Sequence, residues 1–210
     1  QGFAMSVFLY SLKYYEEKDL KNIIILTLIG WSMHYSSGIC ILIAYILRNI
    51  KISKKLYIYI LILGTVFCFF NPIEPIIVNF PFFGIKEKFI AYIQFSETIS
   101  LIDILQRMTI LIIFMINVDK FEGRDKKVFN VYIWGWIFYC LLSFNATVAT
   151  RINMFFRVLE VILLPNLLCN CKNQTMKIFL YIFIVLWTLA TLIISLMNPY
   201  NFPYKIINLI

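Results

Sequence analysis

The chain has 210 residues, of which 61% are hydrophobic and only 14% are charged. A soluble globular domain carries about 25% charged residues, so this chain has too few polar side chains to cover a water-facing surface. Its net charge of +8 is spread over short segments between apolar runs, which is typical of membrane topology and not of a nucleic-acid partner.

Long apolar runs indicate an all-α, polytopic membrane helix bundle, because about 20 mostly apolar residues cross about 30 Å of hydrocarbon. The runs are continuous and do not alternate as the strands of a transmembrane barrel do. We expect a single integral membrane domain over residues 1–210, with about six transmembrane helices and a truncated one. The chain opens at Gln1 and enters apolar sequence at once, so we expect an N-terminally truncated fragment.

In chain order, residues 3–12 are expected to form the end of the truncated helix, and a charged segment follows at residues 13–21. The expected spans then lie at about 22–47, 56–71, 98–117, 128–149, 152–169 and 178–197. The longest connection, residues 72–97, carries prolines and an aromatic run. It is expected to fold back on the membrane surface, where aromatic side chains are favoured.

The positions of Lys and Arg predict how the chain is oriented. The connections 48–55, 119–127 and 170–177 hold ten of the 19 Lys and Arg residues, and the remaining connections hold seven. The positive-inside rule therefore places these three connections in the cytoplasm. Residues 13–21, the connection 72–97 and Arg151 are then expected on the outer side.

Polar side chains inside the spans are the first candidates for function, because a charge at a helix centre costs about 2.5–3.5 kcal/mol on insertion scales. His34, the only histidine, lies near the middle of the expected first span. It is either hydrogen-bonded in a close helix contact or part of a polar cavity wall. Asp103 and Arg107 are four residues apart and are expected to form a structural ion pair.

Charged residues near the expected membrane boundaries form a second group. Arg157 and Glu160 are three residues apart and can pair, whereas Arg151 has no acidic residue nearby in the sequence. Arg151 is either an interfacial anchor or a docking group for an anion such as a lipid-linked diphosphate, which suits its planar fork. Glu97 is either a solvated carboxylate or a catalytic acid or base. The five cysteines show no zinc-binding spacing, and nothing in the sequence requires a metal or cofactor.

Several segments, taken in order, resemble those of a known family. They are Gln1–Met5, the small-residue segment Ile29–Ser37, the basic stretch Tyr45–Lys55, Arg151–Phe156 with the later Leu164-Pro165, and Asn198–Tyr204. Together they resemble the EpsG-like family of polysaccharide polymerases, which is related in role to the Wzy O-antigen polymerases. The likeness runs from end to end of the chain.

The resemblance implies a glycosyltransferase-type polymerase that crosses the cytoplasmic membrane several times. It would join polyprenyl-diphosphate-linked oligosaccharide repeats into capsule, O-antigen or exopolysaccharide on the outer face, among membrane lipid and other polysaccharide-export proteins. An arginine, for which Arg151 is the candidate, would stabilise the charge on the leaving diphosphate, and His34 or Glu97 would act as the base. Substrate-binding roles are expected for Gln1 from the resemblance and for Arg107 and Arg157 from their position.

Three other functions remain open at this point. A flippase or transporter of lipid-linked sugars also places polar residues at depth, although the chain shows no internal repeat of the kind many transporters have. A membrane acyltransferase that modifies the same glycan would use a catalytic histidine such as His34. A purely structural or assembly subunit is favoured if the polar residues all pair internally.

Overall fold

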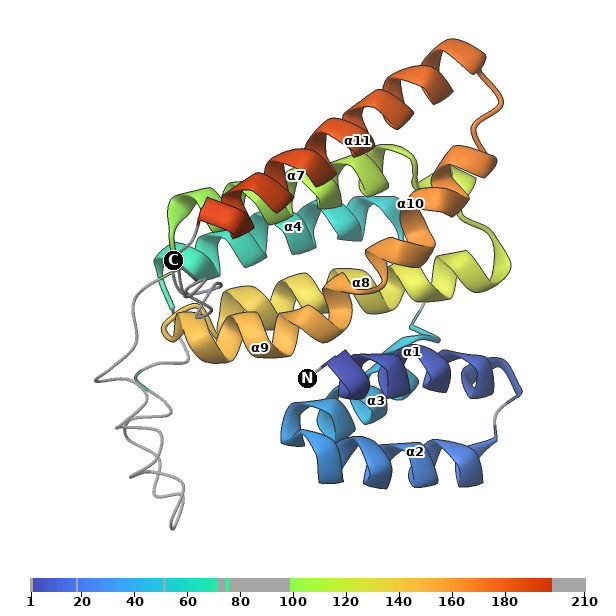
Figure 1. The fold of residues 1–210 in the computed structure, drawn as a ribbon, viewed down its shortest axis with the longest axis vertical. Coiled ribbons are helices and arrows are strands. Elements are labelled where there is room, and N and C mark those ends of the chain that lie inside the picture. Colours follow the sequence, from blue (N-terminus) through green and yellow to red (C-terminus); the bar gives the residue numbers. More distant parts are fainter. Residues whose placement is uncertain (1, 18, 51, 72–74, 76–98, 198–210) are drawn as a thin grey trace, which may run out of the picture. The chain divides into compact units, whose positions relative to one another are not determined.

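The computed structural model describes residues 2–17, 19–50, 52–71, 75 and 99–197, and this part of the chain is helical without any strand (Figure 1). The prediction of an all-α protein is therefore confirmed. The helices are α1 (Gly2–Glu17), α2 (Leu20–Met33), α3 (Tyr35–Leu47), α4 (Lys54–Phe69), α7 (Leu101–Ile116), α8 (Gly123–Leu141), α9 (Ala146–Arg157), α10 (Glu160–Cys169) and α11 (Gln174–Met197).

The chain divides into two compact units, residues 1–163 and 164–210, and the contacts described below belong to the first. The bounds of α4, α7 and α11 are close to those of the expected spans. The expected fourth span ends too late, because α8 stops at Leu141. The expected fifth span is divided into α9 and α10. The connection 72–97 lies outside the described residues apart from Pro75, and the single-domain arrangement stays a prediction.

The expected first span, residues 22–47, is wrong. Its sequence forms two short helices, α2 and α3, which are joined at His34, where the backbone is extended (φ −163°, ψ 120°). At 1.5 Å per residue, α2 is about 21 Å long and α3 about 20 Å, so neither covers about 30 Å of hydrocarbon. The two helices lie side by side and run in opposite directions (Figure 1). They form a helical hairpin with His34 at its tip.

Small residues explain why these two helices approach so closely. A Cβ added to Gly30 would lie 2.7 Å from the hydroxyl oxygen of Ser37. A Cβ on Gly38 would lie 2.9 Å from the carbonyl oxygen of Thr27. Glycine and serine let helix backbones come together at such contacts. The polar, small-residue run around His34 is therefore a helix–helix contact, and His34 ends one helix and begins the next.

Hydrogen bonds fix the hairpin against α1. The hydroxyl of Ser37 donates to the carbonyl of Ala4 at 3.2 Å, and the hydroxyl of Tyr15 donates to the carbonyl of Ile41 at 3.0 Å. Early residues of α1 thus meet early residues of α3, so α1 and α3 run in the same direction. The end of α1 and the end of α3 consequently lie at the same end of the unit.

This arrangement contradicts the predicted orientation of residues 13–21. Tyr15 and Arg48 line one pocket together with Arg124 at the start of α8. At the same end, Lys54 of α4 forms an ion pair with Asp119, which follows α7. Residues 13–21 and 48–55 therefore cannot lie on opposite sides of a membrane, as the sequence analysis had placed them.

Aromatic and polar contacts join the remaining helices of the first unit. The hydroxyl of Tyr57 in α4 donates to Asn130 of α8 at 2.7 Å. Phe8 of α1 packs edge-on against Phe155 and Phe156 of α9, with ring centroids 6.0 and 6.2 Å apart. Helix α9 runs back along α8 (Figure 1). Helix α9 therefore packs against α1 through Phe155 and Phe156, and it also lies along α8.

Apolar surface and helix length fit a membrane protein. Within the described residues, two helical stretches, Ala146–Cys169 and Gln174–Ile194, are long and apolar enough to cross a membrane. Leu28, Ile62 and Leu105 are each more than half exposed. Exposed apolar side chains in such number are suited to contact with lipid. The count of six transmembrane helices stays a prediction.

Candidate functional site

Arg107 is the most deeply buried charged side chain of the α7–α8–α9 region, with 9% of its surface exposed. It does not pair with Asp103. The carboxylate of Asp103 instead accepts from the hydroxyl of Ser100 at 2.7 Å, at the N-terminus of α7. The expected structural ion pair between Asp103 and Arg107 is therefore wrong. Ser100 and Asp103 cap the helix locally, which leaves the guanidinium free to turn inward.

The guanidinium of Arg107 is held by α8 and α9. Its Cζ lies 3.9 Å from the centroid of the Tyr139 ring, which is a cation–π contact. The side chain of Asn153, only 4% exposed, accepts from Arg107 through its amide oxygen, while its amide nitrogen donates to the carbonyl of Gly135 at 3.2 Å. Asn153 therefore links the arginine to the backbone of α8.

Arg157 lies on the same side of α9 as Asn153, four residues further along the helix. Its Nε is 3.6 Å from Oε1 of Glu160, so the predicted pairing of these two residues is confirmed. The hydroxyl of Tyr132 donates to the same carboxylate oxygen at 2.9 Å. Glu160 thus interacts with both Arg157 and Tyr132. Its single negative charge balances the positive charge of only one of the two arginines.

Arg107 and Arg157 line a common pocket, which we call the arginine pocket. Its wall consists of Arg107, Leu111, Tyr132, Trp136, Asn153 and Arg157. Within the described residues, Nε of Arg107 is buried and has no hydrogen-bond partner. Unsatisfied buried donors are unfavourable. Two guanidinium groups with one carboxylate leave a net positive charge and one unpaired guanidinium donor beside this pocket, and both favour an anion.

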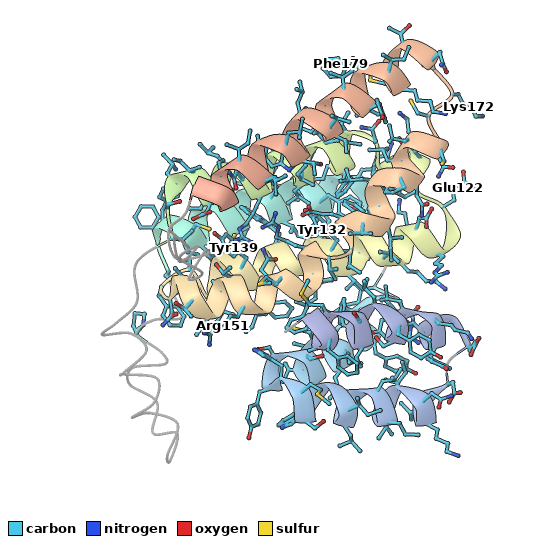
Figure 2. The ribbon with its side chains drawn as sticks, in the orientation of Figure 1. Glu122, Tyr132, Tyr139, Arg151, Lys172 and Phe179 are labelled. Carbon is cyan, nitrogen blue, oxygen red and sulfur yellow. The ribbon has the colours of Figure 1, made fainter. Side chains whose placement is uncertain are left out.

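Arg151 lies on the opposite face of α9. At 100° per residue, Asn153 and Arg157 are about 200° and 240° around the helix from it. Arg151 is exposed and forms no ion pair within the described residues. Figure 2 shows it near the beginning of α9, at the end of the unit opposite to Glu122 at the start of α8.

The tip of the hairpin meets this second face of α9. The ring of His34 lies 6.0 Å from the ring of Phe155, one helical turn from Arg151. Nδ1 of His34 is buried and has no partner within the described residues. The structure thus places His34 against the face of α9 that carries Arg151, and it brings Arg107 and Arg157 together on the other face.

Two of the residues singled out in the sequence cannot be placed. Gln1 and Glu97 lie outside the described residues, so their expected roles stay predictions. The described residues contain no group of three or more His, Cys, Asp or Glu side chains that would hold a metal ion.

Four side chains of this region were not predicted from the sequence: Tyr132, Trp136, Tyr139 and Asn153. The three α8 residues have a signal that the sequence does carry, because spacings of four and three residues place them on one helix face. Asn153 and Arg157 are likewise four residues apart. The sequence does not show that Arg107, which is distant in the chain, packs against both the α8 residues and the α9 pair.

The comparisons with known proteins give one family. A model of the EpsG family matches residues 1–206. No curated protein matches the chain, and no solved structure matches it.

Proposed function

Because the chain belongs to the EpsG family, which makes it a membrane protein of polysaccharide biosynthesis, we propose that it is a glycosyltransferase-type polymerase. Its substrates are oligosaccharide repeats linked to polyprenyl diphosphate. Its product is a capsule, O-antigen or exopolysaccharide chain, and its place is the cytoplasmic membrane, with the reaction on the outer face.

The observation that supports this proposal most is the arginine pocket. Keeping Arg107 buried without a carboxylate of its own is unfavourable in a membrane protein, where unpaired charges at depth are usually functional. Arginine binds phosphate oxygens through two parallel N–H groups and keeps its charge. A diphosphate supplies the negative charge and the acceptors that Arg107 and Arg157 lack.

The two faces of α9 suit a reaction between two lipid-linked molecules. Each substrate carries a diphosphate, and the first unit presents two separate arginine sites: the arginine pocket, and Arg151 beside His34. In the transfer, a hydroxyl of one sugar attacks the anomeric carbon of the other. The bond from that carbon to the diphosphate oxygen breaks, and polyprenyl diphosphate leaves.

We assign Arg151 to the leaving diphosphate, whose developing charge it stabilises. His34 is the nearby side chain that can accept the proton of the attacking hydroxyl, and Glu97 remains the second candidate for this role. Arg107 and Arg157 then hold the diphosphate of the other substrate. In this assignment α9 carries an arginine for each lipid-linked molecule on opposite sides.

The hairpin reverses the predicted position of residues 13–21, but it supports the predicted cytoplasmic position of residues 48–55, 119–127 and 170–177. If residues 20–47 enter and leave the membrane on one side, residues 13–21 join the basic side. That side then has thirteen Lys and Arg residues, whereas the other connections have four, namely Lys86, Lys88, Arg151 and Lys205. The positive-inside rule places the basic side in the cytoplasm. Arg151 is then on the outer side, where flipped lipid-linked repeats are presented.

The test is complementation in a strain that lacks the gene, with polymer length measured on a gel and protein level measured in parallel. Arg107→Lys and Arg151→Lys keep the positive charge but lose the planar guanidinium group, which can form two parallel hydrogen bonds to a phosphate. Each is expected to abolish long polymer while single lipid-linked repeats accumulate on the outer face. Lys172→Gln, an exposed change outside both arginine sites, serves as the control and should give normal polymer.

Two results would contradict the proposal. Long polymer of normal length from both Arg→Lys variants would exclude the assigned arginine roles. Loss of lipid-linked repeats from the outer face, with accumulation on the inner face, would indicate a flippase instead of a polymerase.

A further inference from the structure

A second cationic pocket lies at the end of the first unit that is remote from Arg151. It is formed where α1 and α3 end and α8 begins, and we call it the basic pocket. Its lining residues are Leu12, Tyr15, Arg48, Arg124, Lys127, Val128 and Val131. Glu122, labelled in Figure 2, marks this end of α8.

Arg48 is the central cation of the basic pocket. It is only 4% exposed, and its Cζ lies 3.7 Å from the centroid of the Tyr45 ring and 5.5 Å from that of Tyr15. One guanidinium nitrogen donates to the carbonyl of Tyr45. Its Nε is buried and has no partner within the described residues. A buried guanidinium without a carboxylate needs an anion to offset the loss of water.

Arg124 and Lys127 add two cations from the first turns of α8. Within the described residues neither forms an ion pair. Cations are disfavoured at this position, because a helix N-terminus already carries a partial positive charge. The N-cap residue, Glu122, makes no side-chain hydrogen bond to the first turn. Three cations therefore line the same pocket, and none of the described residues that line it is acidic.

The rest of the wall indicates the chemistry of the ligand. Leu12, Val128 and Val131 are apolar, and they lie next to the cations in the same pocket. A free phosphate or nucleotide gains nothing from such a wall. A phospholipid has both parts, an anionic phosphate for the cations and an acyl chain for the apolar side chains.

We propose that the basic pocket binds an anionic phospholipid, with the headgroup phosphate held by Arg48, Arg124 and Lys127. The proposal goes beyond the polymerase function and does not depend on it. Because Arg48 follows α3 and the other two cations belong to α8, the bound lipid fastens the helical hairpin to α8. Its leaflet is the one on the basic side of the protein.

The experiment uses the full chain, purified in detergent and depleted of lipid. Dioleoylphosphatidylglycerol, dioleoylphosphatidylcholine and inorganic phosphate are added separately. Lipid adducts are counted by native mass spectrometry, and the melting temperature is followed by intrinsic fluorescence. Phosphatidylglycerol is expected to give a retained adduct and a higher melting temperature, whereas phosphatidylcholine and inorganic phosphate give neither.

The decisive variant is Arg124→Gln with Lys127→Gln, since neither side chain is buried and the protein should still fold. At about 1 kcal/mol for each basic residue near a membrane surface, the two changes should weaken binding of phosphatidylglycerol about 30-fold. The matched control is Lys55→Gln with Lys172→Gln, which removes the same charge from exposed positions outside the pocket and should bind as the wild type does.

Three outcomes would overturn the proposal. The first is equal adducts with phosphatidylcholine and phosphatidylglycerol. The second is the same loss of binding in the control pair as in the pocket pair. The third is full stabilisation by inorganic phosphate alone, which would show that the pocket takes a free anion and not a lipid. If an Arg48→Gln variant fails to fold, the double variant Arg124→Gln with Lys127→Gln still tests the proposal.

Discussion

The contact between α8 and α9 at Gly135 gives the sharpest prediction for Gly135→Ala. A Cβ at this position would lie 2.5 Å from Cγ of Phe156 and closer still to its Cβ. Carbon atoms pack at about 3.5–4.0 Å, so the two helices must separate by more than about 1 Å. Because the first clash is with Cβ of Phe156, rotation of the aromatic ring cannot remove it.

The expected loss of stability follows from two opposing effects. Overpacking typically costs about 1–3 kcal/mol, and a contact between two Cβ atoms belongs at the upper end. Replacing glycine by alanine inside a helix returns about 1 kcal/mol. The net loss is about 2 kcal/mol, which lowers the melting temperature of a chain of this size by about 4–8 °C.

The same displacement reaches the arginine pocket, because Asn153 donates to the carbonyl of Gly135 and accepts from Arg107. Gly135→Ala should therefore shorten the polymer as well as lower the melting temperature. Gly2→Ala is the matched control, since nothing lies within 4 Å of a Cβ there. Adding Phe156→Ala should not restore the variant, because alanine keeps the clashing Cβ. If Gly135→Ala has the same melting temperature and polymer length as Gly2→Ala, the close contact between Gly135 and Phe156 is wrong.

The remaining predictions concern the hairpin and Arg107. In a cysteine-free background, Lys21→Cys and Lys55→Cys should both resist an impermeant thiol reagent in intact cells, whereas Arg151→Cys should react; opposite labelling at positions 21 and 55 would rule out the hairpin. Exchanging the charges with Asp103→Arg and Arg107→Asp should not restore polymer, since these residues do not pair, and recovery of activity in the double variant would reinstate the ion pair. Arg157→Lys should lose less polymer than Arg107→Lys, because the ammonium group introduced at position 157 can still pair with Glu160; equal losses would show that both forks bind substrate.

The sequence was sufficient for the all-α class and for three of the expected spans. The apolar runs of α4, α7 and α11 are bounded by polar residues, and hydrophobic length alone places them. The hairpin was missed because residues 22–47 are apolar almost throughout, and a single break at His34 does not change their mean hydropathy. The available signal was the pair of glycines on either side of His34, Gly30 and Gly38, at which the two short helices approach each other.

The candidate site was predictable only in part, for a physical reason. The pairing of Arg157 with Glu160 is local, and a spacing of three residues on a helix was enough to find it. The position of Arg107 depends on residues of α8 and α9 that are distant in sequence. Its local partner, Asp103, looked sufficient, but capping by Ser100 at the start of α7 holds that carboxylate elsewhere.

Helix α9 connects the two arginine sites in a way that constrains the mechanism. Phe155 and Phe156 are consecutive residues; Phe155 contacts His34 at the hairpin tip, and Phe156 fits against Gly135 in α8. Both rings also pack against Phe8. A displacement of α9 on one side is therefore transmitted to the other through close-packed aromatic rings. Binding of a diphosphate in the arginine pocket would thus shift the positions of Arg151 and His34. Such coupling suits a reaction that proceeds only when both substrates are bound.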